Sequence, residues 1–147
     1  QITSAPKLYD HPATRLFSGS MGSPAMNFMD IRLSTDGQWA EISGDIKLPL
    51  TNGSIPEFGG QDVILGIRPE HFELAEEKEG MMQLRVDHVE LLGADTLVHG
   101  HFGENKTSLT IRIADIQHFE KHTILPLIVP PQKLHLFDKK SGKRIGK

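Results

Sequence analysis

The feature that most constrains the fold of this chain is a short apolar run that a proline brings to an end. Residues 63–67 (VILGI) are apolar, with one glycine among them, and Pro69 follows two residues later. Such a run is typical of a buried strand. Because Pro69 cannot donate a hydrogen bond to a sheet and favours an extended conformation at Arg68, the strand should end there. We therefore predict a core strand that ends in a structural corner made by Arg68, Pro69 and Glu70.

The charged residues Arg68, Glu70 and His71 make this corner a candidate active site as well. However, no nucleophile and no phosphate-binding loop lies near them in the sequence. Acid, base and charge-binding groups need such partners to carry out a reaction. We therefore interpret the corner as a group of ion-paired residues with a structural role.

Other stretches of the chain have the alternating or apolar patterns of strands, separated by turn residues such as Asp36 and Gly37. Pro126 lies within one of them, so we expect residues 124–129 to form an edge strand. Residues 115–122 fit either one helical turn or a loop. Regular short strands predict an all-β barrel or sandwich, and the remaining predicted strands are 31–33, 39–42, 46–50, 84–92, 96–102, 108–113 and 134–138.

Composition excludes several classes of function. The chain has 147 residues and no cysteine, which removes disulfides, thiolate metal sites and cysteine nucleophiles. The net charge is -3 and aromatic residues make up 6%, so we expect no nucleic-acid partner. No apolar run approaches the roughly 20 residues that span a bilayer, and we expect a soluble chain.

Two short sequences imitate nucleotide-binding loops and fail in their context. Residues 59–61 (GGQ) resemble the end of a γ-phosphate-binding signature loop, but Phe58 replaces the required serine and a strand is predicted where a helix is needed. Residues 142–143 (GK) imitate the end of a Walker A loop, but Phe137 occupies the position of its first glycine. We therefore expect no cofactor site and no catalytic residue in this chain.

The histidines are candidate metal ligands. His99 and His101 lie two residues apart on a predicted strand, so their side chains share one face, and His88 could supply a third ligand across the sheet. The spacing is not diagnostic in a chain with 8 histidines. We expect no metal site; the alternative is a metal-dependent enzyme built on His99 and His101.

Two surface features remain. Leu91 and Leu92 are adjacent on a predicted strand and must point to opposite faces, so one of them is exposed unless both faces are covered. An exposed leucine beside Glu90 favours a protein interface, and a fully enclosed strand is the alternative. The basic residues near the C-terminus we interpret as a solvated hairpin; they are Lys133, Lys139, Lys140, Lys143, Arg144 and Lys147.

Motifs from one end of the chain to the other resemble the C-terminal region of ATP-binding subunits of carbohydrate-type ABC importers, the maltose and glycerol-3-phosphate class. Within this class they are most similar to the glycerol-3-phosphate branch. The matching motifs are QI at 1–2, LY at 8–9, residues 17 and 22–28, LGIRPEH at 65–71, VELLGAD at 89–95, HG at 99–100 and LHLFD at 134–138.

The resemblance implies an OB-like fold of the transport-associated (TOBE) type. Residues 1–28 would form a helical or irregular segment that connects to an ATPase domain, and residues 29–147 a regulatory domain with one or two interleaved barrel-like halves. The parent protein would be an ABC transporter ATPase that uses ATP and magnesium. It would bind permease subunits at the cytoplasmic face of the bacterial cell membrane.

For this chain itself, the resemblance implies a non-catalytic regulatory and dimerisation domain. Glu90, Leu91, Gly93 and Phe137 match motifs at interface or regulatory positions, and we add Leu92 as the other candidate for the exposed leucine. The expected partners are a second copy of the chain and a regulatory protein. The alternative function is an OB barrel that senses a small anion or an oligosaccharide.

Overall fold

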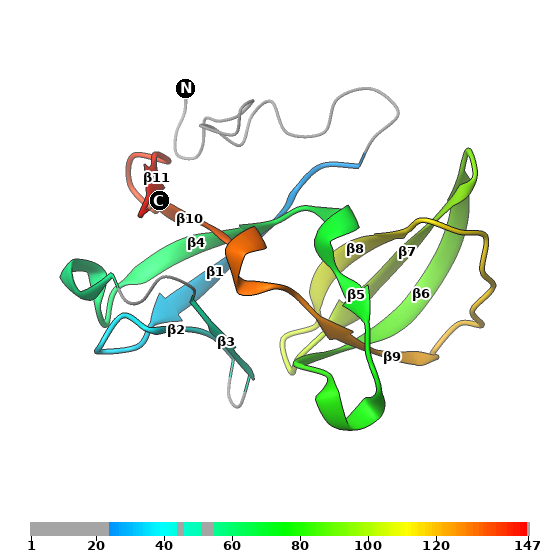
Figure 1. The fold of residues 1–147 in the computed structure, drawn as a ribbon, viewed down its shortest axis with the longest axis horizontal. Coiled ribbons are helices and arrows are strands. Elements are labelled where there is room, and N and C mark those ends of the chain that lie inside the picture. Colours follow the sequence, from blue (N-terminus) through cyan, green and yellow to red (C-terminus); the bar gives the residue numbers. More distant parts are fainter. Residues whose placement is uncertain (1–23, 44–45, 51–54, 147) are drawn as a thin grey trace. The chain divides into compact units, whose positions relative to one another are not determined.

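The computed structural model describes residues 24–43, 46–50 and 55–146, and it is built from antiparallel strands with short 3-10 turns between them (Figure 1). The predicted all-β class is therefore confirmed. The described residues form two compact units, the first running up to Ile67 and resuming at Pro131, and the second spanning Arg68–Pro130. No helix in these residues is long and apolar enough to cross a membrane. Residues 1–23, most of the segment that we expect to be helical or irregular, lie outside the described residues.

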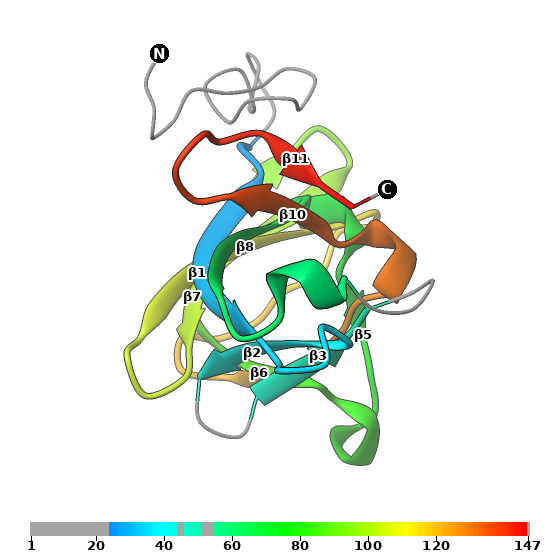
Figure 2. The ribbon, with the colours of Figure 1, turned by 90° about the vertical axis from the view of Figure 1, so that its left-hand side faces the viewer.

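The first unit is an antiparallel sheet with the strand order β11-β10-β4-β1-β2-β3. Figure 2 shows this sheet curled, with β10 and β11 towards one end and β2 and β3 towards the other. Strand β10 pairs with β4, so the C-terminal residues complete a sheet that starts near residue 27. The elements are β1 (Asn27–Leu33), β2 (Trp39–Ser43), β3 (Ile46–Pro49), η2 (Pro56–Phe58), β4 (Asp62–Ile67), η5 (Pro131–Lys133), β10 (His135–Asp138) and β11 (Arg144–Ile145).

Strand β4 is buried on both of its faces, as predicted for residues 63–67. Val63, Leu65 and Ile67 alternate along one face and are at most 1% exposed. Ile64 points to the other face and is 5% exposed. A strand covered on both sides has no polar face, which explains why this sequence is a continuous apolar run rather than an alternating one.

Phe137 lies in the core on the second face of β4. It is 2% exposed and clusters with Met26 and Ile64, and its ring lies edge-on to that of Phe28 at 5.8 Å. Gly66 leaves space for these side chains, since a Cβ there would lie 2.6 Å from the sulfur of Met26. Its side chain is therefore part of the core of the first unit. The expected interface or regulatory role of this position stays a prediction.

The turn between β1 and β2 forms at the predicted residues, Asp36 and Gly37. The Asp36 carboxylate accepts hydrogen bonds from the Ser34 hydroxyl (2.6 Å) and the Gln38 amide (3.0 Å), and these bonds lower the pKa of Asp36. Gly37 has a φ of 72°, a conformation that glycine adopts without steric cost. The predicted hairpin is confirmed.

The second unit is an antiparallel sheet with the strand order β5-β9-β6-β7-β8. Its buried side chains come from all of its longer strands and include Leu84, Val98, Ile111 and Leu127. The elements are η3 (Pro69–His71), β5 (Glu73–Leu74), η4 (Glu77–Glu79), β6 (Met82–Leu92), β7 (Asp95–Phe102), β8 (Thr107–Ile113) and β9 (Ile124–Ile128). Residues 115–122 form turns and a loop, the second of the two predicted alternatives.

The corner after β4 forms where the sequence predicts it. The strand ends at Ile67, Arg68 is extended, and Pro69 begins the 3-10 turn η3. Pro69 is buried, whereas Glu70 is exposed. Neither Arg68 nor Glu70 has a salt-bridge partner among the described residues, so the ion pairs expected of these two side chains are not found there.

The prediction that residues 124–129 form an edge strand is wrong. Strand β9 lies between β5 and β6. Its proline is tolerated because the carbonyl of Pro126 accepts from the Ala75 amide (2.9 Å), just beyond the end of the two-residue strand β5. Since the nitrogen and carbonyl of one residue point to the same side of a strand, the missing donor of Pro126 faces the place where β5 has ended.

We predict that Gly100→Ala destabilises the protein much more than Gly66→Ala. A Cβ at Gly100 would lie 2.2 Å from the backbone carbonyl oxygen of Arg85, which cannot move without opening the β6–β7 pairing. At Gly66 the nearest atom is the end of the flexible Met26 side chain. Urea unfolding followed by circular dichroism should place Gly66→Ala near the lower end of the roughly 1–3 kcal/mol that overpacking costs and Gly100→Ala at or above its upper end. Equal losses would contradict this account.

Candidate functional site

The hairpin formed by β6 and β7 carries most of the site residues predicted from the sequence. Leu92 pairs with Asp95 at its end, and Gly93 and Ala94 form the two-residue loop. Gly93 has a φ of 63°, and glycine at the first position of such a loop is typical of a type II′ turn. The structure therefore gives Gly93 a clear role in the turn itself.

A β-bulge sets which side chains of β6 share a face. Val86 pairs with Gly100 and His88 with His99, so Asp87 is an extra residue in β6. Beyond the bulge, His88 and Glu90 lie on the same face as His99, which we call the histidine face. Val89 and Leu91 lie on the opposite face.

Leu91 is the exposed leucine of the pair. It is 55% exposed, the highest value among the described large hydrophobic residues, whereas Leu92 is half-buried. Leu91 lies directly opposite Thr96 on β7. The side chain that the sequence predicts to be available for a partner is thus Leu91.

Thr96 holds a second exposed aliphatic residue on the same side of the hairpin. Thr96 is fully buried, and its hydroxyl donates to the carbonyl of Asp115 (2.6 Å) and accepts from the amide of Gln117 (2.9 Å). These bonds fix the backbone around Ile116, which is 50% exposed. We call Leu91 and Ile116 the aliphatic patch. Sequence reasoning missed Ile116 because it lies outside any strand, in the segment left open as a turn or loop.

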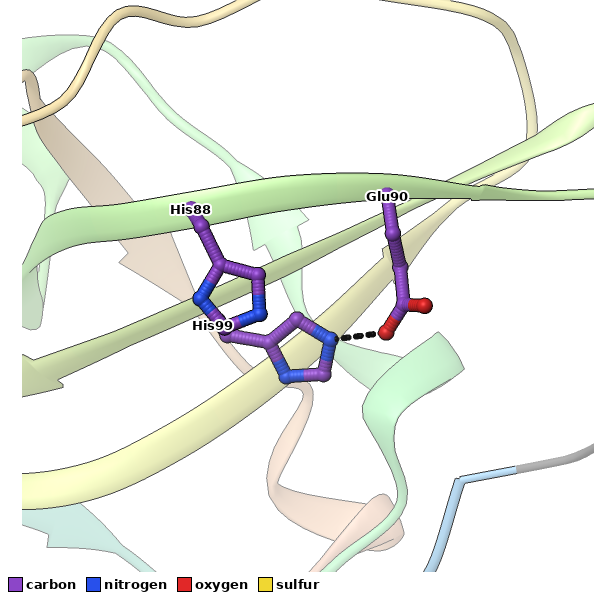
Figure 3. A group of neighbouring side chains, drawn as sticks. All are labelled: His88, Glu90 and His99. Carbon is purple, nitrogen blue, oxygen red and sulfur yellow. Dashed lines mark hydrogen bonds and ion pairs between the residues drawn. The ribbon is translucent and has the colours of Figure 1, made fainter.

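On the histidine face, three potential metal ligands lie together (Figure 3). The ligand atoms of His88, Glu90 and His99 are all within 4.8 Å of one another. Nε2 of His99 lies 2.6 Å from Oε1 of Glu90, and the rings of His88 and His99 are stacked with centroids 4.5 Å apart. His88 and Glu90 are exposed and His99 is partly buried. The hydroxyl of Thr110 lies 3.0 Å from Nδ1 of His99, on the other side of the ring from Glu90.

His101, the other predicted ligand, has its own partner. Its Nδ1 lies 3.1 Å from Oδ1 of Asp87, the extra residue of the bulge. The structure groups His99 with His88 and Glu90, whose ligand atoms all lie within 4.8 Å of one another, and not with His101.

The second unit also contains an open hollow of about 360 Å³, lined in part by Glu70, Glu73, Leu74 and Arg112. Nε of Arg112 lies 2.6 Å from Oδ2 of Asp95, so the only basic group of the lining is paired with a carboxylate. Glu70 and Glu73 have no salt-bridge partner among the described residues. This arrangement repels anions and does not favour the anion-sensing alternative.

The two imitations of nucleotide loops lack the required structure. Residues 59–61 are followed by strand β4 and not by a helix, as predicted. Gly142 lies in the turn between β10 and β11, and its amide donates to the carbonyl of Asp138 (2.8 Å). Neither loop precedes a helix that could bind a phosphate.

We predict that Thr96→Val destabilises the second unit by about 1–3 kcal/mol, because the carbonyl of Asp115 and the amide of Gln117 each lose a buried hydrogen bond. Thr96→Ser retains the hydroxyl and is the matched control. Chemical unfolding should separate the two variants, and hydrogen exchange of the Gln117 amide should accelerate only in the valine variant. Equal stability of the two variants would show that the hydroxyl is not what holds this segment.

Comparison with known proteins matches the chain to two domain families in succession. The model of the MalK OB fold domain matches residues 22–72, and that of the TOBE domain matches residues 65–137. The corner at residues 65–72 lies in both matches. The predicted OB-type fold is thereby supported along most of the described chain.

Individual relatives match the whole chain. The sn-glycerol-3-phosphate import ATP-binding protein UgpC of Escherichia coli O157:H7 is 40% identical over 145 residues, which is 99% of this chain and 40% of the relative. The proteins of the same name from Shigella boydii serotype 4 and E. coli strain K12 are each 39% identical over the same lengths. The chain thus spans well under half the length of these relatives. In sequence order, the chain contains an OB fold domain of the MalK type and a TOBE domain.

Proposed function

We propose that this chain is the regulatory and dimerisation region of an ABC importer ATP-binding subunit for glycerol-3-phosphate or a sugar. The parent subunit would hydrolyse ATP with magnesium and bind permease subunits at the cytoplasmic face of the membrane. Similarity to import ATP-binding proteins over 99% of the chain supports this assignment. The described residues supply no nucleotide-binding loop, which fits a region that regulates and does not catalyse.

The observation that carries the dimerisation role is the exposure of the aliphatic patch. Leu91 and Ile116 lie on one side of the β6–β7 hairpin and are 55% and 50% exposed. Burying an aliphatic side chain of this size contributes about 1.5–3 kcal/mol.

A second copy of the chain is the partner that we propose for this patch. In a two-fold dimer both copies use the same surface, so the contact would bury Leu91 of each copy. A stable contact of this kind buries about 800 Å² on each partner, so residues around the patch would take part as well. Paired regulatory regions would keep two subunits together while their ATPase domains open and close.

We predict that Leu91→Asp converts a dimer of this chain into a monomer, because it places a carboxylate in the apolar centre of the contact. Analytical ultracentrifugation over a range of concentrations measures the change. The control is Leu74→Asp, since Leu74 is also an exposed leucine of the second unit, 40% exposed, but lies on β5. A wild-type chain that stays monomeric at high concentration, or equal effects of the two variants, would contradict the proposed dimer.

Calorimetry distinguishes this function from the ligand-sensing alternative. We expect no saturable heat when glycerol-3-phosphate, inorganic phosphate or maltose is titrated into the chain, because Arg112 is paired with Asp95 and two unpaired carboxylates line the hollow. Saturable binding that Arg112→Ala abolishes would favour the sensor instead.

A further inference from the structure

We propose that His88, Glu90 and His99 form a binding site for a divalent transition-metal ion of the zinc type on the histidine face of the β6–β7 hairpin. The two imidazoles and the carboxylate come from neighbouring strands, and Figure 3 shows all three side chains pointing toward one another. The inference does not depend on the proposed dimer, because the ligands lie on the face of the hairpin opposite to Leu91.

The backbone brings the ligands together without any further folding. His88 and His99 are directly opposite in the register of β6 and β7, and Glu90 lies two residues beyond His88 on the same face. Ligand atoms bound to one tetrahedral ion at about 2.1 Å lie about 3.4 Å apart. The three ligand atoms are already within 4.8 Å of one another, and two of the side chains are exposed. Because the rings of His88 and His99 are stacked, the exposed His88 ring must turn for both imidazole lone pairs to point at one ion.

Thr110 orients the imidazole of His99. Its hydroxyl oxygen lies 3.0 Å from Nδ1, while Nε2 points toward Glu90. A hydroxyl can donate to Nδ1 or accept from it, so this bond persists in either neutral tautomer. With a metal ion bound, Nδ1–H donates to Thr110 and the lone pair of Nε2 binds the ion. Support of a ligating histidine through its second nitrogen is a general feature of metal sites.

The chemistry of the ligands selects the class of ion. Two imidazole nitrogens and one carboxylate oxygen suit zinc, copper and nickel, whereas magnesium and calcium require six or more oxygen ligands. Three protein ligands leave one position of a tetrahedral ion open to water. Since the ligands are largely exposed, the ion can enter directly from solvent.

His101 provides a matched control on the same strand and the same face. Its Nδ1 lies 3.1 Å from Asp87 and it is not one of the three clustered ligands. The sequence alone offers His99 and His101 with His88 as a third ligand, whereas the structure groups His88, Glu90 and His99. The two assignments make opposite predictions for substitution of Glu90 and of His101.

The test is calorimetric titration of zinc chloride into the chain prepared without a histidine tag. We expect one equivalent to bind saturably to the wild type and to His101→Ala, and saturable binding to be lost in His88→Ala and His99→Ala. Glu90→Gln should weaken binding, and Thr110→Val should weaken it about 10-fold or more. Magnesium chloride should give no saturable heat.

Folding and coordination need separate readouts. Thermal melts followed by circular dichroism show whether each variant is folded. Zinc should raise the melting temperature of the wild type and of His101→Ala, but not that of His88→Ala or His99→Ala. Cobalt(II) in place of zinc should give the visible absorption of a tetrahedral nitrogen and oxygen site. Absence of saturable zinc binding by the wild type, loss of binding in His101→Ala, or equal binding by folded His99→Ala would overturn the proposal.

Discussion

The surface of the second unit depends on one constraint, the pairing of β6 with β7 through a bulge. The extra residue, Asp87, shifts the register by one position. A shift of one residue moves every following side chain to the other face of a strand. Without the bulge, Leu91 would lie on the face of His99, and His88 and Glu90 would leave that face. Gly100 lies beside the bulge and packs closely against the backbone of Arg85. Only a residue without a Cβ allows so close an approach.

The bulge separates two surfaces with different chemistry on one hairpin. One face carries imidazoles and a carboxylate in reach of each other, and the other carries Leu91 beside the segment that Thr96 holds in place. Neither face needs a cavity, and neither needs a nucleotide. Both surfaces lie within the stretch that the TOBE domain model matches.

The strands were largely predictable because their signals are local. The apolar run of β4, the turn at Asp36 and Gly37, and the end of β4 before Pro69 all follow from backbone sterics and side-chain burial over a few residues. The errors concern neighbours. The sequence shows that Pro126 lacks a backbone N–H donor and so predicts an edge strand. It does not show that the neighbouring strand β5 is only two residues long and ends before Pro126. The ion pairs expected at Arg68 and Glu70 require oppositely charged partners, and neither side chain has one in the part of the chain that the structure describes.

By itself the sequence determined the all-β class, the positions of most strands and turns, and the alternative that either Leu91 or Leu92 faces outward. Only the tertiary structure decided that the leucine is Leu91, that Phe137 belongs to the core, and that Glu90 rather than His101 joins His88 and His99. The physical reason is that local sterics and hydrophobic periodicity act within a strand, whereas these three outcomes depend on register and packing between strands distant in sequence.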